Sequence, residues 1–149
     1  MKIKLILILL SLLSVSCQKK DSNGASKIHW DRDMCARCVM VVSDRTNTIQ
    51  LKNPSSGKKY VFDDIGCLVL WVEDEKIDWI DKAKIWITDK SNGEWIDAKK
   101  AFYSSENITP MAYGYSAYKS RDKIKSNEEV IDFVEVSKRV IEFEANKSH

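Results

Sequence analysis

The chain of 149 residues is long enough for one compact domain or two small lobes, which excludes a large multidomain enzyme. Hydrophobic residues make up 44% and charged residues 31%, with only 5 glycines and 2 prolines, so collagen-like, coiled-coil and disordered chains are excluded too. Without its first 16 residues the chain loses Lys2 and Lys4 and no acid, and the net charge falls from +2 to zero. A neutral chain offers no basic surface for nucleic acid.

The first 16 residues have the parts of a bacterial export signal. Two lysines precede an apolar run from Leu5 to Leu13 that Ser11 alone interrupts, and small residues stand just before Cys17. The run is too short to span a bilayer as a mature helix. The end of this segment, up to Cys17, resembles a lipobox, in which a lipid is joined to the cysteine sulfur before cleavage. Cys17 is therefore the predicted lipid anchor. An ordinary secretory signal cut nearby is the alternative.

Residues 17–27 are polar and small, without periodicity, and are typical of a flexible tether between a lipid and a domain. We therefore expect the folded domain to cover residues 28–145. Attachment to a bacterial membrane, facing the periplasm, follows from the export signal and Cys17. Gln18 after the cysteine favours sorting to the outer membrane.

The first predicted elements are a hairpin and a helix. Short β-branched and aromatic stretches predict strands at 39–42, 48–51 and 59–62, with a turn at 53–57. Asp63 or Asp64 can cap a following helix. Apolar residues then occur on all sides of that helix, which predicts that it is covered on both sides and that Cys67 is buried.

Further strands and a second helix follow. Strands are predicted at 83–88, 94–97, 102–103 and 111–118, with an Asn-Gly turn between the first two. A capping box of Ser126 and Glu129 predicts the start of the final helix, whose apolar face would carry Val130, Phe133, Val134, Ser137 and Ile141. This order predicts an α+β fold with short antiparallel strands and a C-terminal helix.

The cysteines point to chemistry rather than to a disulfide scaffold. If Cys17 carries lipid, three cysteines remain, and an odd number cannot all pair. Cys35 and Cys38 can converge on one ion, and Met40 can supply a third sulfur. Thiolate and thioether sulfurs favour Cu(I), and thiolates also bind zinc or iron–sulfur clusters. A bare CxxC is shared with redox pairs and zinc knuckles.

The alternatives for this CxxC are less well supported by the sequence. Zinc would need further ligands, and only Cys67, His29 and His149 remain. A thioredoxin-like pair would stand at a helix N-terminus, whereas here the motif precedes a predicted hairpin. Met111, between Pro110 and Gly114, is a second candidate sulfur ligand, although a methionine is more often a core residue.

Three motifs in order resemble the NosL family of copper-binding lipoproteins. They are the segments 33–40 (DMCARCVM), 62–68 (FDDIGCL) and 111–114 (MAYG), which accompany the lipobox. The resemblance covers most of residues 31–120. The resemblance implies two small ββαβ lobes, one Cu(I) held by sulfur, and handover to nitrous oxide reductase with help from its membrane ABC-transporter complex.

Carried over by position, the resemblance implies Cys35, Cys38, Met40 and Met111 as copper ligands. Val39 and Ala112 stand where the family usually has glycine, which affects how closely the backbone approaches the metal. The Asp63–Asp64 pair is interpreted as a helix cap, with orientation of the metal ligands as a second role. Whether Cys67 or His29 joins the site is left open.

The sequence therefore predicts a membrane-anchored Cu(I) carrier rather than an enzyme, which supplies nitrous oxide reductase or another exported copper protein. An exported thiol redox lipoprotein that uses Cys35 and Cys38 is the alternative function, and a structural lipoprotein with a Cys35–Cys38 disulfide is a third possibility.

Overall fold

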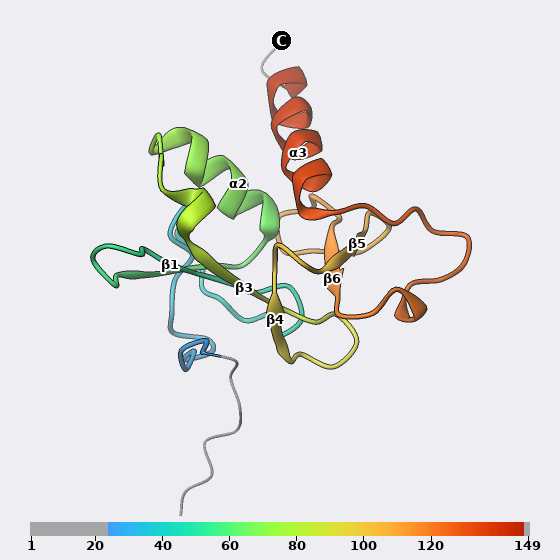
Figure 1. Ribbon diagram of the computed structural model, residues 1–149, viewed down its shortest axis with the longest axis horizontal. Coiled ribbons are helices and arrows are strands. Elements are labelled where there is room, and N and C mark those ends of the chain that lie inside the picture. The colour runs from blue at the N-terminus through green and yellow to red at the C-terminus, as the bar shows by residue number, and fades with distance from the viewer. Residues whose placement is uncertain (1–23, 148–149) are drawn as a thin grey trace, which may run out of the picture.

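The computed structural model describes residues 24–147, and the predicted export signal and lipid anchor Cys17 lie outside them. Within the described residues the chain forms a four-stranded and a two-stranded antiparallel sheet, with two α-helices on the same side of them (Figure 1). Neither of these helices is long and apolar enough to cross a lipid bilayer. The α+β class, the antiparallel strands and the C-terminal helix are as predicted.

The predicted hairpin consists of β1 (Ile49–Lys52) and β2 (Lys59–Phe62), which pair with Ile49 opposite Phe62. Asn53 stabilises the turn because its side-chain oxygen accepts hydrogen bonds from the backbone N–H groups of Ser55 and Ser56. β1 also pairs with β3 (Lys84–Thr88), and β3 pairs with β4 (Trp95–Asp97), which gives the order β2-β1-β3-β4.

Helix α2 (Ile65–Asp74) packs on this sheet and begins at Asp64, whose carboxylate accepts a hydrogen bond from the Gly66 N–H. Every residue from Ile65 to Trp71 is buried, as the apolar composition of all its sides predicts. The succession β1, β2, α2 and β3 forms one ββαβ unit. This arrangement places Asp63, Asp64 and Cys67 at the buried junction between β2 and the first turn of α2.

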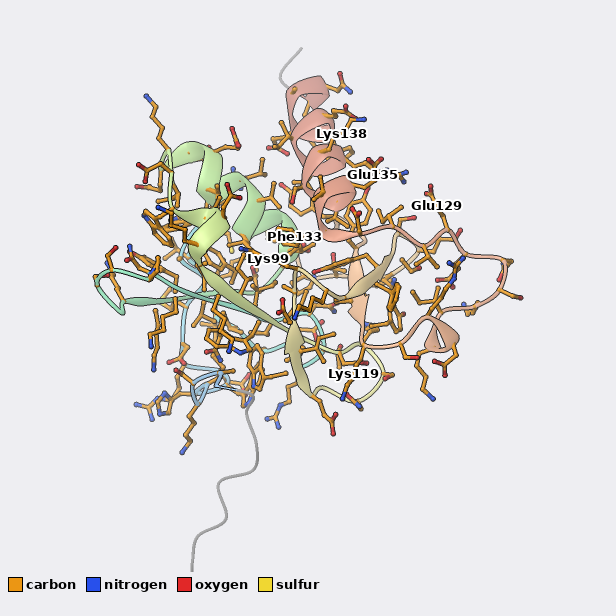
Figure 2. The ribbon with its side chains drawn as sticks, viewed as in Figure 1. Lys99, Lys119, Glu129, Phe133, Glu135 and Lys138 are labelled. Carbon is orange, nitrogen blue, oxygen red and sulfur yellow. The ribbon has the colours of Figure 1, made fainter. Side chains whose placement is uncertain are left out.

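The second group of elements consists of β5 (Phe102–Ser104), β6 (Ser116–Tyr118) and α3 (Phe133–Lys147). β5 and β6 pair antiparallel, and α3 packs against α2. Figure 2 shows Phe133 on the side of α3 that faces α2 and Glu135 on the other side. Two short 3₁₀ turns, at Ile80–Lys82 and Arg121–Lys123, complete the described chain.

Three sequence expectations about local structure were wrong. Residues 39–42 form no strand, and only a single bridge joins Met34 to Val41. The strand predicted at 111–118 contains only Ser116–Tyr118, because the preceding residues adopt an irregular loop.

The third error concerns the start of α3. Ile131 pairs with Tyr103, so the backbone is still extended there, and the Asp132 carboxylate accepts a hydrogen bond from the Glu135 N–H. The expected capping box is absent, since Glu129 instead pairs with Arg139. On α3 the buried residues are Val136 and Val140, whereas Val134, on the predicted apolar face, is exposed.

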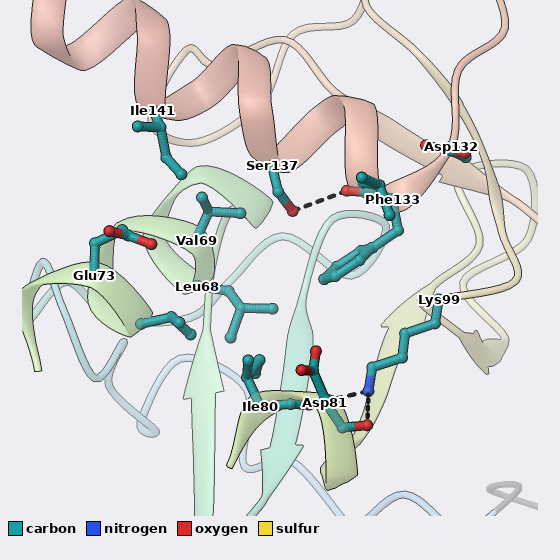
Figure 3. Close-up of a pocket in the computed structure, with 12 residues that line it drawn as sticks. Leu68, Val69, Glu73, Ile80, Asp81, Lys99, Asp132, Phe133, Ser137 and Ile141 are labelled. Atoms are coloured by element: carbon teal, nitrogen blue, oxygen red, sulfur yellow. Dashed lines mark hydrogen bonds between the residues drawn. The ribbon is translucent and has the colours of Figure 1, made fainter. Parts of the chain in front are cut away.

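The predicted apolar face of α3 lines an open groove of about 480 Å³ between α2 and α3 (Figure 3). Apolar side chains form most of its walls, including Leu68, Val69, Phe133 and Ile141. Lys99 lies at one side, where its ammonium group donates hydrogen bonds to the carbonyl groups of Ile80 and Asp81. The groove contains no cysteine, methionine or histidine, so its lining offers no soft metal ligand.

Candidate metal centre

The CxxC motif lies in a tight loop formed by residues 33–42, which we call the cysteine loop. Backbone hydrogen bonds close it from Val42 N–H to the Asp33 carbonyl at 2.8 Å and from Cys35 N–H to the Met40 carbonyl at 2.8 Å. The Ala36 N–H also donates to the carbonyl of Val61 in β2 at 2.8 Å. The loop is therefore fixed against the hairpin, and these backbone hydrogen bonds position the two cysteines.

The fold brings four candidate ligands together from three segments. Cys35 and Cys38 come from the cysteine loop, Asp63 from the end of β2, and Cys67 from the first turn of α2. The ligand atoms of these residues all lie within 4.8 Å of one another. Sulfur ligands around a single tetrahedral ion with metal–sulfur bonds of about 2.3 Å would be separated by roughly 3.8 Å, so small side-chain shifts suffice for a common ion.

The three thiols differ in their ease of deprotonation. Interaction with the neighbouring Cys67 thiol, together with nearby backbone N–H groups, lowers the pKa of Cys35 to about 6, although burial opposes the shift. The same interaction, followed by burial, raises the pKa of Cys67. Burial raises the pKa of Cys38 to about 11. Cys35 is therefore the thiol of the cluster that loses its proton most readily.

Asp63 adds a buried carboxylate to the cluster. The Cys38 sulfur lies 3.5 Å from each of its oxygens, and the residue is 2% exposed. Among residues 24–147, no lysine, arginine or histidine forms an ion pair with it. A buried carboxylate that lacks a cationic partner is costly unless a cation neutralises it. This environment favours a bound metal ion.

The sequence-predicted ligands are only partly gathered in this cluster. Cys35 and Cys38 belong to it, with Cys35 buried and Cys38 half-buried. Met40 adjoins the cluster through its backbone, while its side chain is 50% exposed. His29 lies apart, where its ring nitrogen Nδ1 is 3.4 Å from a carboxylate oxygen of Asp33. Cys17 is outside the described residues.

Met111 lies in the irregular loop that covers the N-terminus of α2. The second carboxylate oxygen of Asp64 accepts hydrogen bonds from the Met111 N–H at 3.0 Å and from the Thr109 hydroxyl at 2.6 Å. Asp64 itself is fully buried, and burial raises its pKa. Met111 is half-buried and packs against the core. One carboxylate thus ties the Met111 segment to the helix that carries Cys67.

Tyr113 fixes the same loop from the other side. Its ring lies against Gly66, where a Cβ atom would approach the ring to 2.1 Å. The Tyr113 hydroxyl donates to the Glu144 carboxylate of α3 at 3.2 Å, and its ring packs edge-on to Phe143. Only a glycine at position 66 allows this close packing of the ring on the helix.

Sequence reasoning left Cys67 and Asp63 outside the predicted ligand set. The available signal was their position at the N-terminus of α2. Asp63 directly precedes the cap residue Asp64, and Cys67 follows Asp64 by three residues. Their convergence with Cys35 and Cys38 depends on the contact between the cysteine loop and β2, which no local pattern indicates.

The fold and the cluster define a small α+β protein with a soft-donor site suited to a metal ion. The structure is similar to the crystal structure of the copper chaperone NosL from Shewanella denitrificans, with a TM-score of 0.62 over 74% of this chain and 94% of that chain, at 14% sequence identity. The expected resemblance is thus confirmed for the fold. No protein-family model matches the sequence, and a search of curated proteins found no match.

Proposed function

We propose that this protein binds one Cu(I) ion in the cluster of Cys35, Cys38, Cys67 and Asp63 and carries it to an exported copper protein. The single observation that supports this most is the convergence of three thiols beside a buried carboxylate. Thiolates are soft donors that suit Cu(I), and the similar solved structure is that of a copper chaperone. Met40 and Met111 remain candidate thioether ligands, because both belong to segments that adjoin the cluster.

The proposed role is transport rather than catalysis. A site with two or three sulfur ligands leaves coordination room for the ligands of a partner, so the ion can exchange without a free intermediate. The proposed recipient is nitrous oxide reductase, assisted by its ABC-transporter assembly complex. A lipid on Cys17 would hold the carrier at a bacterial membrane facing the periplasm, and would raise its concentration near a membrane-bound partner.

Copper binding is tested by anaerobic titration of the protein with Cu(I) in competition with a chromophoric Cu(I) chelator. We expect uptake of about one equivalent, which is lost in Cys35→Ser and Cys38→Ser. Met34→Leu is the matched control, because it removes an exposed sulfur from the same loop outside the proposed ligand set. Copper that stays with the chelator in the presence of the wild-type protein would contradict the proposal.

Zinc is the competing cargo, since three cysteines and one aspartate also make a closed tetrahedral set. The same titration is therefore repeated with excess Zn²⁺ present. We expect Cu(I) to displace Zn²⁺ because thiolates bind the softer ion more tightly. Retention of Zn²⁺ against Cu(I) would instead identify a structural zinc site.

The thiol redox alternative has one observation in its favour, which is the lowered pKa of Cys35. The three cysteines are free thiols in the described structure, but Cys35 is only 2% exposed. An attacking thiolate must reach its disulfide substrate. Reduction of a model disulfide by the protein, lost in Cys35→Ser, would support this alternative, and an inert protein would exclude it.

Lipid attachment has its own test. The intact mass of membrane-extracted protein should include acyl chains, and Cys17→Ala should abolish both the added mass and membrane retention. A wild-type chain without added mass would show that an ordinary secretory signal is cut instead.

A further inference from the structure

The cysteine loop exposes an unusual amount of apolar surface. Four of its residues are large, hydrophobic and exposed, and we call them the loop face: Met34, Val39, Met40 and Val41. None of the four is needed to fill the core. Exposed apolar residues scattered singly are ordinary, whereas several together on one short segment are typical of a contact surface. Methionine is also common on surfaces that adapt to a partner.

Val39 carries the clearest sign of a role outside the fold. Its φ angle is 61°, in the left-handed region that β-branched residues avoid, and its side chain is 64% exposed. Its N–H donates to the Cys35 carbonyl at 3.1 Å, which holds this backbone conformation in place. Glycine would adopt the same conformation without strain. The valine side chain therefore adds strain and little packing, which is the kind of local strain that occurs at functional positions.

One of the two charged residues of the cysteine loop has an opposite-charge partner within the protein, because the Arg37 guanidinium lies 2.9 Å from the Asp74 carboxylate of α2. The other, Asp33, accepts a hydrogen bond from the His29 N–H at 2.9 Å and lies 3.4 Å from the His29 ring nitrogen Nδ1. The loop face therefore combines apolar side chains with little unpaired charge. Such a surface fits an apolar and uncharged protein surface better than an anionic membrane or an acidic peptide.

The loop face also lies at the accessible edge of the metal cluster. Cys35 and Cys67 are buried, whereas Cys38 is half-buried and directly precedes Val39. An ion held by these sulfurs is reached most easily from the side of Cys38. A partner seated on the loop face would thus be placed next to the cluster's most exposed ligand.

We propose that the loop face is the docking surface for the protein that receives the copper ion, with Val39 as its apolar anchor. This inference rests on the proposed function. The partner would present an apolar, uncharged rim around a soft-donor site of its own. In the transfer step a donor atom of the partner bonds to Cu(I) while the bond to Cys38 breaks, and the bonds to the remaining ligands of the cluster then break in turn as further partner donors bind the ion. The thiolates that are released take up protons from the buffered solvent. The ion remains Cu(I), so no electron is transferred.

The test compares two recipients of copper from the Cu(I)-loaded, full-length protein. One recipient is copper-free nitrous oxide reductase with its ABC-transporter assembly complex, and the other is a small chromophoric chelator that needs no docking surface. Two variants are used: Val39→Gly relieves the backbone strain, and Val39→Asn keeps a side chain that tolerates the left-handed region while removing the apolar group. For each variant, the rate to the protein recipient is divided by the rate to the chelator.

We expect this ratio to fall at least tenfold in both variants. Val39→Gly should at the same time raise the melting temperature by roughly 3 °C, because the strain is removed. A more stable variant that delivers copper more slowly cannot be explained by damage to the fold. An unchanged ratio of the two transfer rates in either variant would overturn the inference. If both variants also lost a self-association that the wild type shows, while delivery stayed intact, the loop face would instead be assigned to contact with a second copy of this chain.

The outcome separates this inference from the proposed function. A wild-type protein that binds no Cu(I), or that delivers none to the reductase and its complex, contradicts the proposed function and with it the docking surface. A wild-type protein that binds and delivers Cu(I), with variants that deliver equally fast, contradicts the docking surface alone.

Discussion

The sulfurs of Cys67 and Cys35 lie within 4.8 Å of each other, although one residue lies in α2 and the other in the cysteine loop. The β1–β2 hairpin separates the two in the sequence, so the contact exists only in the folded chain. It favours the thiolate form of Cys35. Residues far apart in the sequence are thus brought to one site by the fold.

The first prediction concerns the effect of Cys67 on the Cys35 thiol. Cys67→Ala removes the neighbouring thiol, so the pKa of Cys35 should rise from about 6 toward the ordinary thiol value of 9.0. The thiolate absorbance near 240 nm, followed against pH under anaerobic conditions, measures the change. Cys67→Ser is the matched control, because its hydroxyl can still donate to Cys35. Identical titration curves for the wild type and Cys67→Ala would contradict the role of Cys67.

A second prediction links the same thiolate to stability. The folded pKa of Cys35 lies below the unfolded value, so its contribution is complete above about pH 9 and is lost as the pH falls through about 6. The free energy of unfolding should thus rise between pH 6 and 8, by up to about 2 kcal/mol from this group. Urea unfolding of the reduced protein at both pH values measures the rise. The Cys35→Ser variant lacks the titrating thiol. A rise of the same size in the unfolding free energy of this variant would assign the effect to another group.

The third prediction separates the two candidate thioether ligands. Met111→Leu and Met40→Leu remove a sulfur and keep a similar volume, so each should cost less than about 1.5 kcal/mol of stability. If a thioether binds the ion, its leucine variant should weaken Cu(I) affinity at least about tenfold in the chelator competition. We expect this for Met111, whose N–H bonds to Asp64 at the start of the helix that carries Cys67, and a smaller effect for the exposed Met40. Unchanged affinity in Met111→Leu would make Met111 a core residue only.

Much of the first ββαβ unit could be predicted because its signals are local. The turn at Asn53, the cap at Asp64 and the apolar character of α2 are each decided by neighbours in the sequence. The start of α3 could not be predicted, since the pairing of Ile131 with Tyr103 is a long-range contact that overrides a local capping box.

The candidate site likewise depends partly on local signals and partly on long-range contacts. The pair Cys35 and Cys38 is visible as a short motif, and both belong to the cluster. Cys67 and Asp63 join them only because the Ala36 N–H bonds to the Val61 carbonyl and holds the cysteine loop on β2. A contact of this kind leaves no periodic trace in the sequence, so the ligand set could be predicted only in part.

The fourth prediction concerns Asp64, which joins α2 to the Met111 loop. One carboxylate oxygen caps Gly66, and the other accepts from Thr109 and Met111. Asp64→Asn has a single oxygen acceptor, and asparagine is a favoured N-cap, so the Met111 N–H should lose its partner. A buried donor without an acceptor costs about 1–3 kcal/mol. Unfolding measurements and amide hydrogen exchange report this cost.

In Asp64→Asn we expect faster exchange of the Met111 amide with protection of the Gly66 amide retained. Cu(I) affinity should fall together with the order of the Met111 loop if Met111 is a ligand. Wild-type stability and exchange in the variant would show that Asp64 acts as a helix cap and does not position the loop.

The last prediction concerns Gly66, whose missing side chain lets the Tyr113 ring lie on the helix. An alanine Cβ there would come within 2.1 Å of the ring, and the ring cannot withdraw freely because its hydroxyl bonds to Glu144. Gly66→Ala should therefore destabilise the protein by about 1–3 kcal/mol, although alanine favours helix more than glycine does. In a Tyr113→Ala background the clash is absent, and the same substitution should stabilise by about 0.5–1 kcal/mol through helix propensity. Urea unfolding of the wild type, both single variants and the double variant gives the coupling energy directly. A stabilising Gly66→Ala in both backgrounds would mean that Tyr113 does not pack on α2, and that the Met111 loop lies elsewhere than beside the cysteine cluster.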